Sequence, residues 1–338
     1  MNDQLRLSAL PLQLPSVQKT LAYFLSQQGL KLDPDVDAAF GIFDADCSLL
    51  ACGCAAGNLL KCFAVDSTMR GQNLLGPIIS ALTQQRFSVG IYDLFIITSR
   101  NNESVFSCCG FYPLIHSDKL VIMENKPNGV EQFARKIKQQ VEPVKDIGAC
   151  VMNCNPFTLG HRALIEYASS YCSLLYVFIL AENRSEFSAD VRLQLAQEAC
   201  ADLRNVYVCS GGPYMISGIT FPSYFLKDSS QATALQGQLD INLFAERIAP
   251  ALNITVRFAG SEPLDPVTAQ YNATMRSTLP KYGILFHEIP RITHNNQVIS
   301  ASTVRKLIQD PDSFELAMPL VPECTRRYLM SHRRSPWK

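Results

Sequence analysis

The sequence has no excess of charge of either sign and no long hydrophobic segment. Its 338 residues include 30 Lys and Arg against 30 Asp and Glu, so the formal net charge is zero. A chain without net charge generates no overall electrostatic field, and we expect it to bind neither nucleic acid nor a membrane surface. The longest apolar stretch, residues 172–181, is too short to cross a bilayer and is typical of a buried strand.

The sequence also lacks an export signal and a metal-binding cysteine pattern. Residues 1–6 do not place a basic segment ahead of an apolar one, so we expect a cytoplasmic protein. The 12 cysteines are scattered, and neither Cys52 with Cys54 nor Cys108 with Cys109 has the spacing or the accompanying histidine pair of a zinc site. We therefore expect buried, reduced thiols and no metal site built from protein ligands.

The most informative stretch, residues 147–170, predicts a strand, a tight turn and a helix. An apolar run is broken by asparagines and a proline, and apolar residues then recur at helical spacing from Leu159. Thr158 occupies the N-cap position. The backbone N–H groups of the first helical turn and the side chain of His161 would face an anion at the positive end of the helix. Gly160 would let a ligand approach the backbone closely.

A second candidate anion site follows about 140 residues later, where Ser300, Ser302, Thr303 and Arg305 open another predicted helix. Three hydroxyls and a cation at a helix start are suited to bind phosphate. Each pattern alone has an ordinary interpretation, since the first could be a capped turn that contains histidine and the second a serine-rich cap. Their combination, order and spacing favour a shared phosphate site.

From residue 147 onward, predicted strands alternate with predicted helices, which indicates a doubly wound parallel sheet. Ligands bind such sheets at the carboxyl ends of the strands. The segments 153–161, 182–187 and 260–265 each follow a strand, so we expect them to converge at that edge. The predicted strands are residues 147–152, 174–180, 206–209, 254–259 and 284–289.

The first 130 residues have a different pattern, in which apolar runs separated by turn residues predict hairpins. With Arg70-Gly71 ahead of a predicted helix, this order resembles the acetyl-CoA-dependent N-acetyltransferase fold. In that family a glycine-rich turn donates N–H groups to the pyrophosphate of CoA. Asn73 and Leu75 stand here where small residues are expected. We favour a degenerate domain, either structural or used to dock a CoA-like group.

The polar segment 131–146, which ends in a proline-containing stretch, is the expected boundary. We therefore divide the chain into an N-acetyltransferase-like α+β domain over residues 1–130, a linker over 131–146, and an α/β domain over 147–338.

The two anion-binding patterns together resemble the paired signatures of the nucleotidyltransferase superfamily, (His/Thr)-x-Gly-His and Ile-Ser-x-Ser-x-(Val/Arg). Across nearly the whole chain, the sequence is similar to the citrate lyase ligase family. The segments that carry this second resemblance are residues 153–161, 221–227, 260–263, 266–272 and 299–305.

The resemblance implies an ATP-dependent acid–thiol ligase, with Mg²⁺ accompanying ATP. Acetate would attack the α-phosphate to give acetyl-adenylate and pyrophosphate. The acetyl group would then pass to the thiol of a phosphoribosyl-dephospho-CoA group on the acyl carrier protein of citrate lyase, which activates that enzyme. The carrier of malonate decarboxylase is an alternative acceptor.

On this resemblance, we expect Thr158, His161 and Arg305 to act in catalysis. Arg184 and Lys227 are candidates for contacts to acetate or phosphate, although Lys227 could simply be solvated. Residues expected to contact ATP are Asn153, Asn155, Pro156, Phe157, Gly160, Arg192, Gly260, Glu262, Ser300, Ser302 and Thr303. For two of these an alternative remains, because Arg192 could be a surface residue of its helix and Glu262 could cap the following turn.

Two other functions stay open at this point. The chain could be an N-acetyltransferase that uses residues 70–76 as its CoA turn, or a nucleotide-binding regulatory protein without activity. The sequence contains neither a lysine-bearing Walker loop nor the Pro-Lys-Gly loop of the large acyl-CoA synthetase family. An activity that releases pyrophosphate only when acetate is present would separate the ligase from both alternatives.

Overall fold

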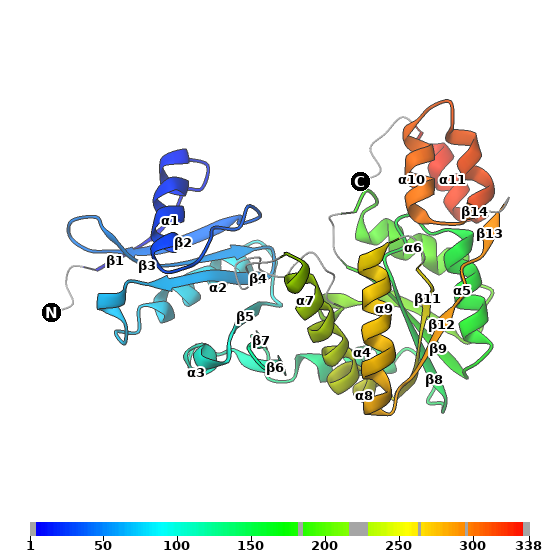
Figure 1. Cartoon of the computed structure of the whole chain (residues 1–338), viewed down its shortest axis with the longest axis horizontal. Helices are drawn as coiled ribbons and strands as arrows, with labels where there is room; N and C mark the ends of the chain where they lie inside the picture. The colour runs from blue at the N-terminus through cyan, green and yellow to red at the C-terminus, as the bar shows by residue number, and fades with distance from the viewer. Residues whose placement is uncertain (1–4, 182–184, 216–228, 263–264, 295–296, 334–338) are drawn as a thin grey trace. The chain divides into compact units, whose positions relative to one another are not determined.

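The chain forms two compact units, which Figure 1 colours from blue to red along the sequence. Unit 1 comprises residues 1–129 and 219–239, and unit 2 comprises residues 130–218 and 240–338. The computed structural model describes residues 5–181, 185–215, 229–262, 265–294 and 297–333. Within these described ranges, no helix is both long and apolar enough to cross a membrane.

Unit 1 is built on a seven-stranded sheet with the order β1-β2-β3-β4-β5-β7-β6. All neighbouring strands are antiparallel except β4 and β5, which run parallel and pair only at Leu59 with Phe95 and Leu60 with Ile96. Its elements are β1 (Arg6–Ala9), α1 (Pro15–Gln27), β2 (Ala38–Phe43), β3 (Leu49–Ala56), β4 (Leu59–Val65), α2 (Leu75–Ser88), β5 (Phe95–Ser99), α3 (Glu103–Ser107), β6 (Tyr112–His116) and β7 (Leu120–Glu124).

The core of unit 1 lies on both faces of this sheet. Helix α2 contributes Ile78, Ile79 and Leu82 to one apolar cluster, and helix α1 contributes Leu21 and Leu25 to a second. The α+β fold predicted for this region is confirmed. The sequence pattern does not predict β1 and β6, which are short edge strands. Their mostly exposed first residues give little apolar periodicity from which to recognise a strand.

Unit 2 contains a five-stranded sheet with the order β10-β9-β8-β11-β12, and every neighbouring pair is parallel. This confirms the predicted parallel sheet. The strand order changes direction between β8 and β11, which makes that position the switch point of a doubly wound fold. The strands are β8 (Ile147–Met152), β9 (Leu174–Ile179), β10 (Val206–Ser210), β11 (Ile254–Gly260) and β12 (Leu285–Ile289).

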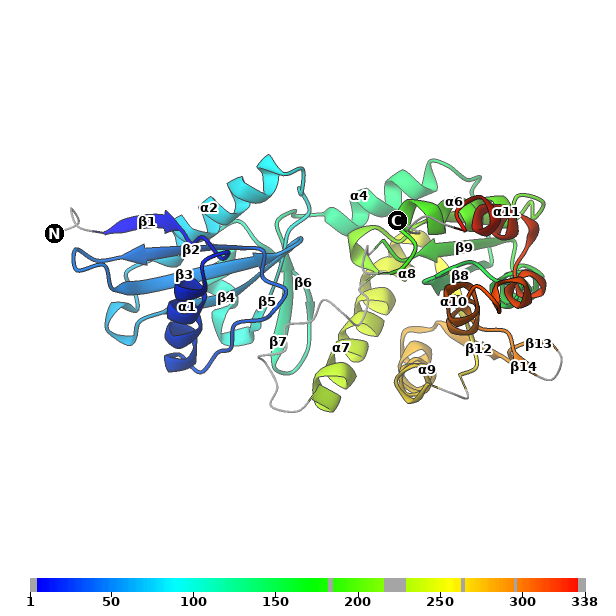
Figure 2. The same ribbon diagram turned by 90° about the horizontal axis from the view of Figure 1, so that it is seen from above.

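Helices cover both faces of the parallel sheet, as right-handed crossovers require. Helices α5 (Leu159–Ser169) and α6 (Ala189–Ala199) pack on one face, and helix α9 (Pro266–Thr278) lies on the other (Figures 1 and 2). The remaining elements of unit 2 are α7 (Ser229–Leu243), which begins in the segment assigned to unit 1, the π-helical Phe244–Ile248, α8 (Ala249–Leu252), β13 (Thr293–His294), β14 (Gln297–Val298), α10 (Ala301–Gln309) and α11 (Glu323–Ser331).

The segment expected as a linker begins with helix α4 (Gly129–Lys138), which belongs to unit 2 from Val130 onward. Val130, Ala134 and Ile137 are buried. Their spacing of four and three residues places them on one helix face, so α4 has the packed stripe of a core helix.

Candidate active site

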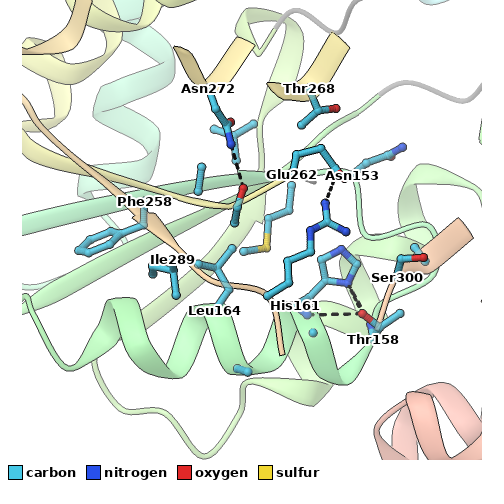
Figure 3. Close-up of a pocket in the computed structure, with 18 of the residues that line it drawn as sticks. Asn153, Thr158, His161, Leu164, Phe258, Glu262, Thr268, Asn272, Ile289 and Ser300 are labelled. Carbon is cyan, nitrogen blue, oxygen red and sulfur yellow. Dashed lines mark hydrogen bonds and ion pairs between the residues drawn. The ribbon is translucent and has the colours of Figure 1, made fainter. Parts of the chain in front are cut away.

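The turn between β8 and α5 is closed by a reciprocal pair of hydrogen bonds between Thr158 and His161 (Figure 3). The Thr158 hydroxyl oxygen accepts from the His161 backbone N–H at 3.4 Å, and His161 Nδ1 accepts from the Thr158 backbone N–H at 3.0 Å. This is a capping box in which histidine takes the place usually held by Glu or Gln. The local sequence therefore ends the strand, starts the helix and fixes the imidazole in one arrangement.

His161 is neutral at ordinary pH. Burial, and secondarily the positive charge of Arg291, lower its pKa from 6.5 to about 4. Because Nδ1 accepts the Thr158 N–H, the ring proton resides on Nε2, which is then a hydrogen-bond donor. Nε2 lies on the side of the ring away from Thr158 (Figure 3).

The second helix start, at α10, has its own cap. The Ser300 hydroxyl accepts from the Thr303 backbone N–H at 3.1 Å and lies 2.9 Å from the Ser302 hydroxyl and 2.8 Å from the Thr303 hydroxyl. The three hydroxyl groups expected from the sequence thus form one hydrogen-bonded group. Among them, Ser300 lines the cavity described below.

Gly160 brings the two helix starts together. A Cβ atom at this position would lie 3.0 Å from the carbonyl oxygen of Ile299, which is tighter than ordinary van der Waals contact. The sequence suggested that the glycine makes room for a ligand. In the structure, the group that approaches it is the backbone just before α10. Gly160 is therefore required for close packing of one motif against the other.

A cavity of about 670 Å³ opens at the carboxyl edge of the sheet, between β8 and β11. It is the switch-point position at which ligands bind in doubly wound folds, and its volume suits a nucleotide-sized ligand. Of the residues predicted to form the site, those that line this cavity are Asn153, Thr158, Gly160, His161, Gly260, Glu262 and Ser300. Figure 3 shows the β8–α5 turn below and helix α9, with Thr268 and Asn272, above.

The cavity is also lined by a cation, Arg291, that sequence patterns do not identify. Arg291, in the loop after β12, forms an ion pair with Glu262 and donates from Nε to the Ser261 carbonyl at 2.8 Å. Glu262 also accepts from the Asp265 backbone N–H at 3.2 Å, so it caps the following turn and holds the arginine at once. The only signal for Arg291 was its place, directly after the carboxyl end of a strand.

Arg192 lies behind the turn rather than in the cavity. Its side chain is fully buried, and it donates to the Asn153 carbonyl at 2.8 Å, to Asn153 Oδ1 at 2.7 Å and to the Phe187 carbonyl at 3.1 Å. This corrects the expectation of a surface position, and it places the side chain outside the residues that line the cavity. The guanidinium thus binds two backbone carbonyl groups and one side-chain amide oxygen.

The neighbouring residues of the turn are also structural supports. Asn155, Pro156 and Phe157 are buried and do not line the cavity. The Asn155 side-chain oxygen accepts from the Phe187 backbone N–H at 3.1 Å. These three residues therefore support the turn from within the protein core, where their side chains are buried.

Arg305 connects the two motifs from outside the cavity. Its Nη1 donates to the Asn155 carbonyl at 2.6 Å, and its Nε lies 3.4 Å from a carboxylate oxygen of Glu186. Ser302 and Thr303 likewise bond to Ser300 without lining the cavity. Arg184 and Lys227 lie outside the described residues.

The described part of the chain contains no cluster of three or more His, Cys, Asp or Glu side chains placed to bind a metal ion. All 12 cysteines are free thiols. Burial raises the pKa of several of them, to about 12 for Cys150 and Cys209, so these thiols are protonated and unreactive at ordinary pH.

Unit 1 contains a cavity of its own, of about 740 Å³, where β4 and β5 cease to pair. The turn before α2 lines it with Arg70, Gly71, Asn73 and Leu75. Asn73 adopts a positive φ of 54°, a conformation that favours glycine. The cavity is thus bordered by a leucine side chain where the N-acetyltransferase pattern has small residues.

The match to known proteins covers both units. Residues 147–329 match the family model for the citrate lyase ligase C-terminal domain. A citrate (pro-3S)-lyase ligase from Klebsiella pneumoniae is 39% identical over 312 residues, which is 91% of each chain. The corresponding ligase from Escherichia coli strain K12 is 37% identical over 92% of this chain and 90% of its own.

Among solved structures, an acyl-CoA N-acyltransferase from Pseudomonas aeruginosa matches 36% of this chain and 99% of its own, at 15% identity and a TM-score of 0.31.

The parallel sheet with its two helix N-termini lies within residues 147–329, the region that the family model covers. Because that model spans more than half of the sequence and the relatives align along nine-tenths of it, the chain belongs to the citrate lyase ligase family of enzymes.

Proposed function

We propose that this enzyme activates acetate with ATP and then acetylates the thiol of the CoA-like group on the acyl carrier protein of citrate lyase. One observation supports the first step best, namely that two helix N-termini, Arg291 and a neutral His161 border a single cavity. Its relatives are named as ligases of citrate lyase, which favours that carrier over the one of malonate decarboxylase.

In this proposal the triphosphate of ATP lies between the starts of α5 and α10. The unpaired N–H groups and the dipoles of both helices favour negative charge there. A carboxylate oxygen of acetate forms a bond to the α-phosphorus, the bond from that phosphorus to the bridging oxygen breaks, and pyrophosphate leaves with the electron pair. Acetate is already ionised, so the step requires neither a protein nucleophile nor a base. Mg²⁺ would be held mainly by phosphate oxygens and water and would neutralise charge on the phosphates.

His161 is the residue to which we assign direct stabilisation of the α-phosphate. Its Nε2–H is fixed by the bond from the Thr158 N–H to Nδ1 and needs no reorientation during the reaction. Thr158 is 1% exposed, so it positions the histidine and contributes little surface to a ligand. Arg305 is likewise a positioning residue, because it ties α10 to the β8–α5 turn.

The base of ATP would lie near Gly260, at the end of β11. A Cβ atom there would meet no atom closer than 3.9 Å, so the strand end leaves room for a flat ring. Glu262 and Arg291 hold each other beside this position. The positive charge of Arg291 then borders the same cavity as the two helix starts.

The decisive measurement is exchange of labelled pyrophosphate into ATP with the purified protein, Mg²⁺ and acetate, and without any carrier. We expect exchange that depends on acetate, since adenylate formation is reversible and the carrier enters only afterwards. Consumption of acetyl-CoA without acetate-dependent exchange would instead identify an N-acetyltransferase. Transfer of labelled acetyl to purified citrate lyase carrier, compared with malonate decarboxylase carrier, then tests the acceptor.

A further inference from the structure

A second cation lines the same cavity, and the function proposed above does not use it. Arg257 lies on β11, three residues before Gly260, and is 4% exposed. Its guanidinium carbon stacks over the Phe244 ring at 4.2 Å from the centroid. Among the described residues, neither Nε nor Nη1 of Arg257 has a hydrogen-bond partner.

The electrostatic surroundings of Arg257 include Asp240, Tyr271 and Cys150. Tyr271 of α9 also lines the cavity, and its hydroxyl donates to the Asp240 carboxylate. Burial and Asp240 raise the pKa of Tyr271 well above its usual value, while Arg257 acts in the opposite direction. The Cys150 thiol, the other titratable group that senses Arg257, is protonated because burial raises its pKa to about 12. Asp240 is thus the nearby anion, and it accepts a hydrogen bond from tyrosine.

A buried guanidinium in which Nε and Nη1 lack partners is costly, and a planar anion that accepts two parallel hydrogen bonds relieves that cost. The neighbouring carboxylate of Asp240 opposes a doubly charged ligand such as phosphate. Because Asp240 already contributes one negative charge here, an anion of single charge is favoured over a doubly charged one. Met275 and Ala259 also line the cavity and offer apolar contact to a short alkyl group.

We propose that Arg257 binds the carboxylate of the short-chain monocarboxylic acid that the enzyme activates. This inference rests on the proposed function, because it assigns the acid to the α9 side of a cavity whose α5 and α10 side would hold the triphosphate. Arg257 and Gly260 belong to one strand, so the acid and the base of ATP would be positioned by the same rigid element. Arg257 thereby becomes a determinant of acid specificity.

The test uses the full chain with acetate as the probe and acetamide as its neutral isostere. Acetate should raise the melting temperature of the wild-type protein in a saturable way, and acetamide should not. Arg257→Met should abolish the acetate effect and raise the KM for acetate in pyrophosphate exchange about tenfold or more, with the KM for ATP within about twofold. Arg327→Met, an exposed arginine 70% accessible on α11, is the matched control and should behave as wild type.

The outcomes separate this inference from the proposed function. A wild-type protein that binds acetate through Arg257 but shows no exchange would retain the subsite and refute the ligase activity. A folded Arg257→Met variant with an unchanged KM for acetate would overturn the subsite and leave the activity standing. Should Arg257→Met not fold, Arg257→Lys decides, because lysine keeps the charge but not the two parallel donors. A KM for acetate raised about tenfold in that variant supports the subsite, and an unchanged value overturns it.

Discussion

The dual role of His161 allows its contribution to catalysis to be separated from its contribution to folding. His161→Ala removes the Nε2–H donor and also the acceptor for the Thr158 backbone N–H. Loss of one preorganised donor to a developing charge lowers kcat by about 10²–10³, or roughly 3–4 kcal/mol. Thr158 is 1% exposed, so its N–H would lose its partner in a buried position, which costs about 1–3 kcal/mol of folding free energy.

His161→Gln is the matched variant. Glutamine is a normal capping-box residue at this helix position, and its side-chain oxygen can accept the Thr158 N–H. We therefore expect its free energy of unfolding to stay within about 1 kcal/mol of wild type, while kcat for exchange falls as far as in the alanine variant. The KM for ATP should change little in both, as expected for an interaction made in the transition state.

The assays are steady-state pyrophosphate exchange and chemical denaturation of both variants. A folded His161→Gln protein with a kcat within about threefold of wild type would falsify the role of the imidazole in the transition state. Equal destabilisation of the two variants would show that the capping bond is not what glutamine restores. Because the two readouts are independent, each part of the argument can fail alone.

Four further predictions follow from the same geometry. The pKa of His161 is lowered to about 4 in the folded protein. Between pH 6.5 and 4 the unfolded chain therefore takes up a proton at this residue and the folded chain does not. The free energy of unfolding should fall over this range by at most about 3 kcal/mol. Arg192→Met should cost about 1–3 kcal/mol in denaturant titrations, since it removes the donor to the Asn153 and Phe187 carbonyl groups. Gly160→Ala should raise the KM for ATP, because the added methyl pushes the Ile299 carbonyl away. Calorimetry should find acetyl-CoA affinity weaker than about 1 μM, or −8 kcal/mol, because Leu75 borders the cavity of unit 1.

Each of these has an outcome that contradicts it. His161→Gln is the pH control, and a stability profile that it leaves unchanged between pH 6.5 and 4 would assign the titration to another group. For Arg192, the exposed Arg327→Met supplies the comparison, and equal stabilities would mean that the buried hydrogen bonds contribute nothing measurable. An unaltered KM for ATP in Gly160→Ala would show that the two helix starts can separate without consequence. Micromolar binding of acetyl-CoA would make unit 1 a cofactor site.

Much of the fold can be predicted from the sequence because its signals are local. The five apolar runs of unit 2 end within one or two residues of the observed strands, and the caps at Thr158 and Ser300 fix where two helices begin. Alternation of strands and helices then forces a parallel sheet whose carboxyl ends share an edge. That is why residues of segments 153–161 and 260–265 could be assigned to one cavity without coordinates, whereas the described residues 185–187 of the third expected segment do not line it.

What only the tertiary structure decided is which charged side chains reach that cavity. Arg192 stands at a helix start in the sequence, yet its guanidinium is directed into the protein because the turn of Asn153 presents carbonyl groups to it. Arg291 and Arg257 follow no motif, and they line the cavity because β11 borders the switch point and β12 pairs with β11. Arg291 donates to a carbonyl group 30 residues away and Arg192 to one 39 residues away, so the identity of these partners depends on sheet order and helix packing. Local periodicity specifies the elements, but the sign and position of charge within the site are set by contacts between elements.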